Sequence, residues 1–491
     1  MTERSRHSPG KLLEPLLKEL GRPGRRAFRL PELDVPARRP EELLPPEILR
    51  KEPADLPEVS ERDLVKHFMR LAHLNFSAET NFYPLGSCTM KYNPKVNEEI
   101  AGLAGFAQLH PCTPEKGAQG ILALLFELEQ LLREILGMDA VTLQPAAGAH
   151  GELTALLMAK AFHESKGHPR RTVVVPDSAH GTNPASAAIC GFEVVEVRSN
   201  ARGRISLSEL ASVMDENVAV FMMTNPNTLG LFEGEVLEIA GLVHERGALM
   251  YLDGANLNAL LGLVRPGEMG FDMVHVNVHK TFSVPHGSGG PGGGPVGVKA
   301  PLKPFLPGPV VQRDEEGYHL ASPGPLSIGR VRSFFGNVGA LVRAYAYIRG
   351  LGKAGLRGVA EGAILNANYL KALLKGVLPI PVDEPCMHEF IASARELKSK
   401  HGVKAMEIAK RLLDYGFYAP TICFPLIVEE ALMIEPSETE SKQTLEAFAE
   451  ALKRICAEAR ENPARVQSAP HRMPVSRLDE VQAAREPNLR W

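Results

Sequence analysis

The chain has 491 residues, more than one ordinary hydrophobic core holds, so we expect at least two domains. Hydrophobic residues make up 44% and charged residues 23%, and the net charge of −3 gives no reason to expect nucleic acid or an anionic membrane as a partner. No apolar run is long enough to span a membrane, and the first residues lack the apolar segment of a signal peptide. We therefore expect a cytoplasmic protein.

The six cysteines are scattered, without a Cys-x-x-Cys pair or the spacing of zinc ligands. We expect reduced, mostly structural thiols and no metal site. Cys88 and Cys112 lie in polar, turn-like segments, so either could approach an active site. An ordinary buried cysteine is the alternative interpretation of each.

The chain begins with segments that have no evident core of their own. An apolar period predicts a short helix over 11–21, and the proline-rich stretch 30–56 predicts an extended arm that wraps a neighbouring chain. Ser60 with Asp63 predicts the start of a second helix. Residues 75–94 have no clear period, and their aromatic and small residues favour a functional loop over a disordered one.

The middle of the chain alternates between strand and helix patterns. Leucine spacing predicts a helix from residue 117 that ends at Gly137, and further helices are expected from Ser206 and over 235–246. The predicted strands are 140–144, 172–175, 192–197, 218–224, 248–252, 272–278 and 295–299. This alternation is typical of an α/β protein with a mostly parallel sheet covered by helices on both faces.

The last third predicts a smaller α+β domain. A long helical region over 338–374 leads into it, followed by two expected strands and two expected helices, at 388–392, 431–435, 403–415 and 439–459. The tail beyond residue 463 has little periodicity. We therefore expect an arm and loop, a large domain, a small domain and a tail, over 1–116, 117–336, 337–463 and 464–491.

Lys280 follows the short β-branched run 272–278, which predicts a buried strand that stops at His279 and Lys280. In an open α/β sheet, ligands bind at the carboxyl ends of the strands, and a partly desolvated lysine there is a good amine nucleophile. This position favours a Schiff-base lysine. An exposed lysine that merely caps a strand is the alternative.

Asp253 ends another buried apolar run, 248–252. Pyridoxal phosphate needs such a pair, a lysine that holds its aldehyde and a carboxylate that keeps its pyridine nitrogen protonated. Further upstream, a strand leads through small residues into a helix near Gly148, and the free amides of a helix start suit a phosphate group. A turn-forming aspartate is the alternative for Asp253.

The glycines between Gly287 and Gly297 allow positive φ and close backbone approach. A dinucleotide-binding loop is the alternative, but the run opens no apolar-periodic helix and no acid follows on a second strand at a suitable distance.

Five motifs, in one order along the chain, resemble those of the glycine-cleavage P-protein family. They are Gly-Ala-His-Gly-Glu at 148–152, Asp-Ser-Ala-His-Gly-Thr-Asn-Pro-Ala-Ser-Ala at 177–187, Thr-Asn-Pro-Asn-Thr at 224–228, Asp-Gly-Ala-Asn at 253–256 and His-Lys-Thr-Phe-Ser at 279–283. The likeness runs from Tyr83 to Val481 and is strongest to the lysine-bearing chain of the two-subunit form. Several long motifs in order are far more specific than a single glycine loop.

The resemblance implies a fold-type I PLP-dependent enzyme with pyridoxal 5'-phosphate held covalently by Lys280. It also implies that Asp253 holds the pyridinium, that His180 lies flat on the ring and that Ala255 covers the opposite ring face. The alternative for His180 is an ordinary turn histidine.

The same resemblance implies that the Thr224 hydroxyl bonds the ring's 3-oxygen and that Ala149 and His150 offer amides to the phosphate, with Asn277 and His279 nearby. For Thr224, a threonine that merely ends a strand stays open as the alternative.

The function implied by the resemblance is decarboxylation of glycine, with transfer of the aminomethyl group to the lipoyl arm of H-protein and no site for NAD. The implied partner is a homologous subunit without the lysine, two copies of each chain forming the complex. Two alternatives stay open, another fold-type I PLP enzyme (an amino-acid decarboxylase or an aminotransferase) and a non-catalytic scaffold subunit.

Overall fold

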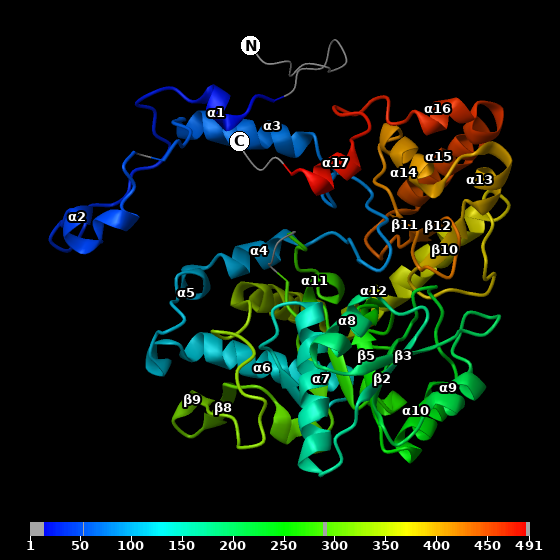
Figure 1. Cartoon of the computed structure of the whole chain (residues 1–491), viewed down its shortest axis with the longest axis horizontal. Coiled ribbons are helices and arrows are strands. Elements are labelled where there is room, and N and C mark those ends of the chain that lie inside the picture. Colours follow the sequence, from blue (N-terminus) through cyan, green and yellow to red (C-terminus); the bar gives the residue numbers. More distant parts are fainter. Residues whose placement is uncertain (1–13, 53, 288–291, 488–491) are drawn as a thin grey trace. The chain divides into compact units, whose positions relative to one another are not determined.

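The computed structural model describes residues 14–52, 54–287 and 292–487 (Figure 1). Internal contacts divide the chain into two compact units, one formed by residues up to 77 with those from 470 onward, the other by residues 78–469. The four-part division expected from the sequence stays a prediction.

The first unit consists of short helices and extended chain. Its helices are α1 (Leu17–Leu20), α2 (Pro40–Leu43), η1 (Pro46–Ile48), α3 (Glu61–His73) and α17 (Glu480–Arg485). Ser60 caps α3 by accepting the backbone N–H of Asp63 at 3.2 Å, as predicted. α1 is shorter than the predicted helix, because the backbone of Leu16 is still extended and the helix begins only at Leu17. Residues 11–13 of the predicted helix lie outside the described part.

The second unit is built on a seven-stranded sheet with the order β1-β7-β6-β5-β4-β2-β3. The strands are β1 (Ala140–Thr142), β2 (Thr172–Pro176), β3 (Glu193–Val197), β4 (Val218–Thr224), β5 (Leu249–Gly254), β6 (Met273–Val276) and β7 (Val296–Val298). The pairs from β6 to β3 are parallel, whereas β7 runs antiparallel to both of its neighbours. The predicted α/β class and mostly parallel sheet are confirmed.

Helices cover both faces of this sheet because alternate strand residues point to opposite sides. Val174 and Leu252 join a core with the helices on one face, whereas Val173 and Tyr251 join a separate core on the other. The first face packs against α6 (Gln119–Leu136), α9 (Leu207–Val213), α10 (Val236–Glu245) and the first part of α12 (Val338–Leu374). The second packs against α7 (Gly148–Ser165) and α8 (Thr182–Ile189).

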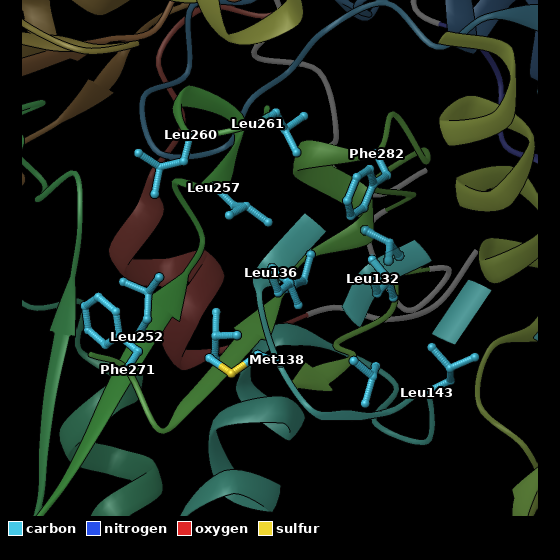
Figure 2. Close-up of a cluster of buried hydrophobic side chains, with 14 of the residues drawn as sticks. Leu132, Leu136, Met138, Leu143, Leu252, Leu257, Leu260, Leu261, Phe271 and Phe282 are labelled. Carbon is cyan, nitrogen blue, oxygen red and sulfur yellow. The ribbon is translucent and has the colours of Figure 1, made fainter. Parts of the chain in front are cut away.

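Segments that follow two predicted site residues are anchored in the first core (Figure 2). Leu257 and Leu260, in and after η3 (Leu257–Ala259), come shortly after Asp253, and Phe282 comes two residues after Lys280. They share this core with Leu132 and other leucines of α6. Burying a side chain of this size contributes about 1.5–3 kcal/mol, so the core fixes the chain on which the site residues lie.

The C-terminal part of the second unit is the predicted smaller α+β region. Its antiparallel sheet has the order β10-β12-β11 and packs with the end of α12 in a core of its own. Its elements are β10 (Phe390–Ser393), α13 (Arg395–His401), α14 (Ala405–Asp414), β11 (Thr421–Ile422), β12 (Ala431–Ile434), α15 (Lys442–Glu461) and α16 (Pro463–Gln467). Gly352, with φ of 59°, interrupts α12, so the long helix is not continuous.

Several short elements were not predicted. They are α4 (Lys95–Ala101), α5 (Ala104–Ala107), η2 (Glu115–Gly117), η4 (Pro266–Met269), η5 (Ala300–Phe305), β8 (Val310–Asp314) and β9 (Gly317–Ala321), besides η3, α13, α16, α17, β11 and the short helices α2 and η1 within the predicted extended arm. The β8–β9 hairpin depends on a distant residue, since the Gln119 side chain bonds both the N–H and the carbonyl of Tyr318. Such contacts between distant residues leave no local pattern in the sequence.

Within the described residues, every helix is too short or too polar to cross a lipid bilayer. The cytoplasmic location stays a prediction.

Candidate active site

Three neighbouring parallel strands carry predicted site residues to one edge of the sheet. Thr224 at the end of β4 pairs in register with Asp253 on β5, and Asp253 pairs with His275 on β6. Asn277 follows β6 directly. The carboxyl ends of β4, β5 and β6 therefore gather a hydroxyl, a carboxylate and an amide, as expected for the ligand edge of such a sheet.

Asp253 is 2% exposed and is held from three directions. One carboxylate oxygen accepts the side-chain amide of Asn183 at 3.2 Å, and the other accepts the backbone N–H of Ala255 at 3.0 Å. The Nε2 atom of His275 lies 3.5 Å from that second oxygen. The sequence predicted no role for Asn183 or His275, although Asn183 lies within the motif at 177–187.

The sequence predicted Lys280 at the end of a strand, but the structure does not place it there. β6 ends at Val276, and Asn277 begins the short helical turn α11 (Val278–Thr281), which carries Lys280. The difference arises because Val278 continues the apolar run as a buried residue of a turn, which a period-two pattern cannot distinguish from strand. The Lys280 ammonium donates to the backbone carbonyl of Ser87 at 2.7 Å.

The loop around Ser87 is held by two buried glutamates that sequence reasoning missed. Glu389 accepts the Ser87 N–H at 2.6 Å and its hydroxyl at 2.9 Å, while Glu435 accepts the N–H groups of Cys88 and Thr89 at 3.1 and 2.9 Å. Ser87 and Thr89 have φ of 55° and 49°, a strained region for residues other than glycine. The predicted functional loop over 75–94 therefore does reach Lys280.

The two cysteines singled out in the sequence differ in their surroundings. Burial raises the pKa of the Cys88 thiol to about 11, although the charge of Lys280 partly opposes the shift. Cys112 is exposed, and its backbone N–H donates to His110 Nδ1 at 3.0 Å. The charge of Lys280 therefore reaches the Cys88 thiol, which places Cys88 near the site.

The start of α7 presents backbone N–H groups beside a cation. Ala149 and His150 lie in the first turn, whose N–H groups precede the first helical hydrogen bond, from the Gly151 N–H to the Ala147 carbonyl at 2.9 Å. The pKa of His150 is lowered, first by burial and then by the charge of Arg332. Helix amides next to a cation form a site for an anion such as phosphate.

Gly148 allows α11 to approach the start of α7. A Cβ atom at position 148 would lie 2.4 Å from the Asn277 side-chain oxygen, so only glycine fits. That oxygen is buried beside His275, and the Thr224 hydroxyl is buried without a hydrogen-bond partner among the described residues. Buried polar atoms without partners are rare and mark places where a ligand or water completes the bonding.

His180 follows β2 in the loop before α8, with part of its side chain open to solvent and part of its ring buried against its neighbours. Its Nδ1 atom lies 2.9 Å from the Thr182 hydroxyl, and its ring meets Phe424 edge-on, with centroids 5.8 Å apart. Burial lowers the pKa of His180, and the charge of Asp253 opposes this shift whereas that of Lys280 adds to it. The charges of Asp253 and Lys280 therefore both act on the His180 ring, so the three residues share one electrostatic environment.

His279 packs against the glycine-rich segment. Its Nδ1 atom accepts the Gly293 N–H at 3.5 Å, and its ring is perpendicular to that of His286, 5.0 Å away. Burial lowers its pKa to about 3. A Cβ atom at position 292 would lie 2.7 Å from His279 Nδ1, and one at 294 would lie 2.0 Å from the Ala147 carbonyl, which confirms the predicted close approach at these glycines. Gly289 and Gly290 lie outside the described residues.

The chain matches two family models. "Glycine cleavage system P-protein" covers residues 39–321 and "Glycine dehydrogenase, C-terminal domain" covers 359–473. It is 57% identical over 481 residues to the probable glycine dehydrogenase (decarboxylating) subunit 2 of Desulforamulus reducens, spanning 98% of this chain and 99% of that one. A protein of the same name from Caldanaerobacter subterraneus is 57% identical over 477 residues, spanning 97% and 98%.

Solved structures agree with this likeness. An inhibitor-bound glycine decarboxylase (P-protein) of the glycine cleavage system superposes with a TM-score of 0.73 at 25% identity, covering 85% of this chain and 95% of that one. The apo cysteine desulfurase of Thermococcus onnurineus NA1, with a TM-score of 0.60 at 14% identity over 77% of this chain and 95% of that one, shares the fold alone.

Proposed function

This chain belongs to the glycine cleavage system P-protein family, and from that premise we propose that it is a glycine dehydrogenase (decarboxylating). In this reaction the carboxyl group of glycine leaves as carbon dioxide, and the aminomethyl group passes to the lipoyl arm of H-protein. The lipoyl disulfide is reduced as it takes up the group, so the enzyme is an oxidoreductase that needs no NAD.

The residues at the sheet edge fit pyridoxal 5'-phosphate as the cofactor. The buried Thr224 hydroxyl, which lacks a protein partner, suits the ring's 3-oxygen, and the carboxylate of Asp253 suits the ring nitrogen. The first turn of α7, with Ala149 and His150, suits the phosphate, and the Lys280 amine suits the aldehyde. Asn277 and His279 belong to the same proposed binding region, because Asn277 packs on Gly148 and begins α11.

Each residue then has a defined task. When bound, the cofactor supplies a ring that accepts the electrons of the bond to the departing carboxylate. Asp253 holds a proton on the ring nitrogen, and Asn183 and Ala255 keep its oxygens oriented. Lys280 leaves the Ser87 carbonyl to hold the cofactor. His180 and Ala255 are proposed to lie on opposite faces of the ring, the small side chain of Ala255 leaving it room.

The observation that carries the proposal is the meeting of Lys280, Asp253 and the unpartnered Thr224 hydroxyl at one sheet edge in a chain matched to this family over most of its length. Labelled bicarbonate exchange into the carboxyl group of glycine, measured with the partner subunit and lipoylated H-protein, tests it. Exchange without transamination of other amino acids is expected. Transamination or decarboxylation of another amino acid, without glycine exchange, would favour a different PLP enzyme, and the absence of any cofactor would favour a scaffold.

The proposed partner is the homologous subunit 1, with two copies of each chain in the complex. The relatives' name, subunit 2, implies such a partner. Within the first unit, apolar side chains in and just before the arm 30–56 are largely exposed, among them Phe28 at 75% and Leu30 at 85%. Apolar patches of this kind mark surfaces that another protein covers.

A further inference from the structure

A chain of hydrogen bonds leads from His180 into the interior. The Thr182 hydroxyl lies 2.9 Å from His180 Nδ1 and also 2.9 Å from an oxygen of Glu152. The other Glu152 oxygen accepts the Ser186 hydroxyl at 3.1 Å. Glu152 is only 4% exposed and ends the motif at 148–152, for which the sequence predicted no role of this carboxyl group.

The Thr182 hydroxyl carries one proton, so it can donate to only one of its two neighbours, His180 Nδ1 or the Glu152 carboxyl group. If that proton points to an ionised Glu152, then Nδ1 of His180 must carry its own proton and donate it to the threonine oxygen. If Glu152 is protonated, it donates to Thr182, and Thr182 donates to an unprotonated Nδ1, which leaves the ring proton on Nε2. The proton on Glu152 and the tautomer of His180 are therefore linked through one hydroxyl.

The backbone provides a second contact with the same nitrogen. The N–H of Thr182 points at His180 Nδ1 from 3.2 Å, which stabilises an unprotonated Nδ1. This contact favours the state in which Glu152 is protonated. Burial also lowers the pKa of His180, which favours the neutral ring, so the two tautomers of the neutral ring are the states between which Glu152 selects.

Glu152 lies where a proton is easily gained or lost. Its neighbours in β5 and β6 are Asp253 and His275, whose side-chain ligand atoms lie within 4.8 Å of its own. Burial, followed by the charge of Asp253, raises its pKa to about 7, while Thr182, Ser186 and the more distant Lys280 oppose the shift. Tyr251 also faces this group, since the charge of Glu152 contributes to its raised pKa.

We propose that Glu152 is a positioning residue that acts through Thr182 to set which ring nitrogen of His180 carries the proton. A fixed tautomer also fixes the orientation of the imidazole, because each nitrogen must face a matching partner. The importance of this for catalysis rests on the proposed function, in which His180 lies on the cofactor ring. The coupling itself is a property of this chain and holds without turnover.

The test is histidine-selective ¹⁵N NMR of the full chain in its complex with the partner subunit, with and without pyridoxal phosphate. The His180 signal is assigned by its loss in His180→Asn. Its tautomer is expected to change between about pH 6 and pH 8, the range in which a carboxyl group with a pKa near 7 titrates. Glu152→Gln and Thr182→Val should each abolish this change, and the double variant should behave like either single one.

Ser186→Ala is the matched control, because it removes the other hydroxyl on Glu152 and leaves the route to His180 intact. The tautomer change should persist there, with its midpoint displaced to higher pH. In glycine exchange, Glu152→Gln should lower kcat about tenfold, the cost of one misplaced hydrogen bond, with KM little changed.

A His180 tautomer change that survives unaltered in Glu152→Gln or in Thr182→Val would overturn the proposal. So would an additive double variant. If the His180 tautomer depends on Glu152 in a chain that exchanges no glycine, the result supports this inference and counts against the proposed function. Failure of the inference and failure of the proposed function are therefore distinguishable.

Discussion

At the scale of single residues, the site combines one amine with one carboxylate whose surroundings differ. Lys280 is partly exposed on a short helical turn and, within the described part of the chain, donates to the Ser87 carbonyl, whereas Asp253 is buried and held by Asn183 and Ala255. The amine is therefore free to change partners, and the carboxylate is fixed. Such a division suits a covalent anchor and a permanent counter-ion.

Lys280→Ala should abolish the covalent attachment of the cofactor and leave the fold intact, because the side chain gives up only its bond to the Ser87 carbonyl. Visible absorbance, and mass spectrometry after borohydride reduction, measure the attachment. Lys299→Ala is the matched control, since Lys299 also donates to a backbone carbonyl, that of Gly137, yet lies elsewhere. A borohydride-trapped adduct at another lysine would refute the assignment.

Asp253→Asn should keep the cofactor bound but lower glycine exchange by about a hundredfold or more, because a neutral amide cannot hold a proton on the ring nitrogen. Asp272→Asn is the control, since this aspartate precedes β6 and accepts the Met250 N–H at 2.8 Å near the opposite ends of the strands. Near-normal turnover in Asp253→Asn would contradict the role given to this carboxylate.

At the scale of elements, the loop before α4 is shaped by residues more than 300 positions away. Glu435 follows β12 and accepts bonds from both Cys88 and Thr89, and Glu389 precedes β10 and binds Ser87. These carboxylates compensate the strain of two positive φ values. The small α+β region thereby holds the loop that Lys280 contacts.

Glu435→Ala should release this loop, because it leaves two buried donors of Thr89 without an acceptor, at roughly 1–3 kcal/mol each, and leaves the Cys88 N–H only the Leu85 carbonyl. Amide hydrogen exchange at Cys88 and Thr89 should accelerate at least about tenfold. Glu430→Ala is the control, since Glu430 accepts the Ala405 N–H in the same region but does not touch the loop. Equal exchange in both variants would show that Glu435 does not hold the loop.

Glu389 should make the protein less stable as pH rises. Burial, followed by the charge of Glu435, raises its pKa from 4.5 to about 8 in the folded chain. The folded state therefore binds more protons than the unfolded state between these values, and the free energy of unfolding falls across that range. Glu389→Gln, which cannot ionise, should flatten this slope in denaturant titrations at several pH values; an unchanged slope would contradict the shift.

At the scale of the whole molecule, the first unit has little core of its own. Its helices α1, α2, η1 and α17 contain no buried residue, and the larger α3 buries only His67. Segments that bury so little apolar surface cannot offset their ordering entropy alone. The proposed partner subunit would supply the apolar surface that these segments lack.

The chain expressed alone should self-associate or aggregate and exchange glycine poorly, and with subunit 1 it should form a complex of two copies of each. Phe28→Ser with Leu30→Ser should weaken that complex, because both side chains are exposed and apolar. Light scattering measures the assembly, and the exposed, charged Glu32→Ser in the same arm is the control. A fully active, well-behaved monomer would refute the two-subunit proposal.

The sequence by itself determined the seven strands of the large sheet, the capped start of α3 and the position of Thr224 and Asp253 at strand ends. These features depend on local periodicity and on which residues follow a buried strand. The motif order determined the family. Each of these signals lies within a few neighbouring residues, so one sequence contains it.

Only the tertiary structure decided which polar residues complete the site. Asn183, His275, Glu389 and Glu435 come from distant segments and carry no local period, and the pKa of Glu152 is raised by burial and then by the charge of Asp253, both of which the fold creates. Likewise, Val278 continues the apolar run of β6 although it belongs to a helical turn, and the close approach of Asn277 to Gly148 is visible only in the folded chain. Desolvation and hydrogen-bond partners arise from contacts between distant parts of the chain, which is why local patterns could not reveal them.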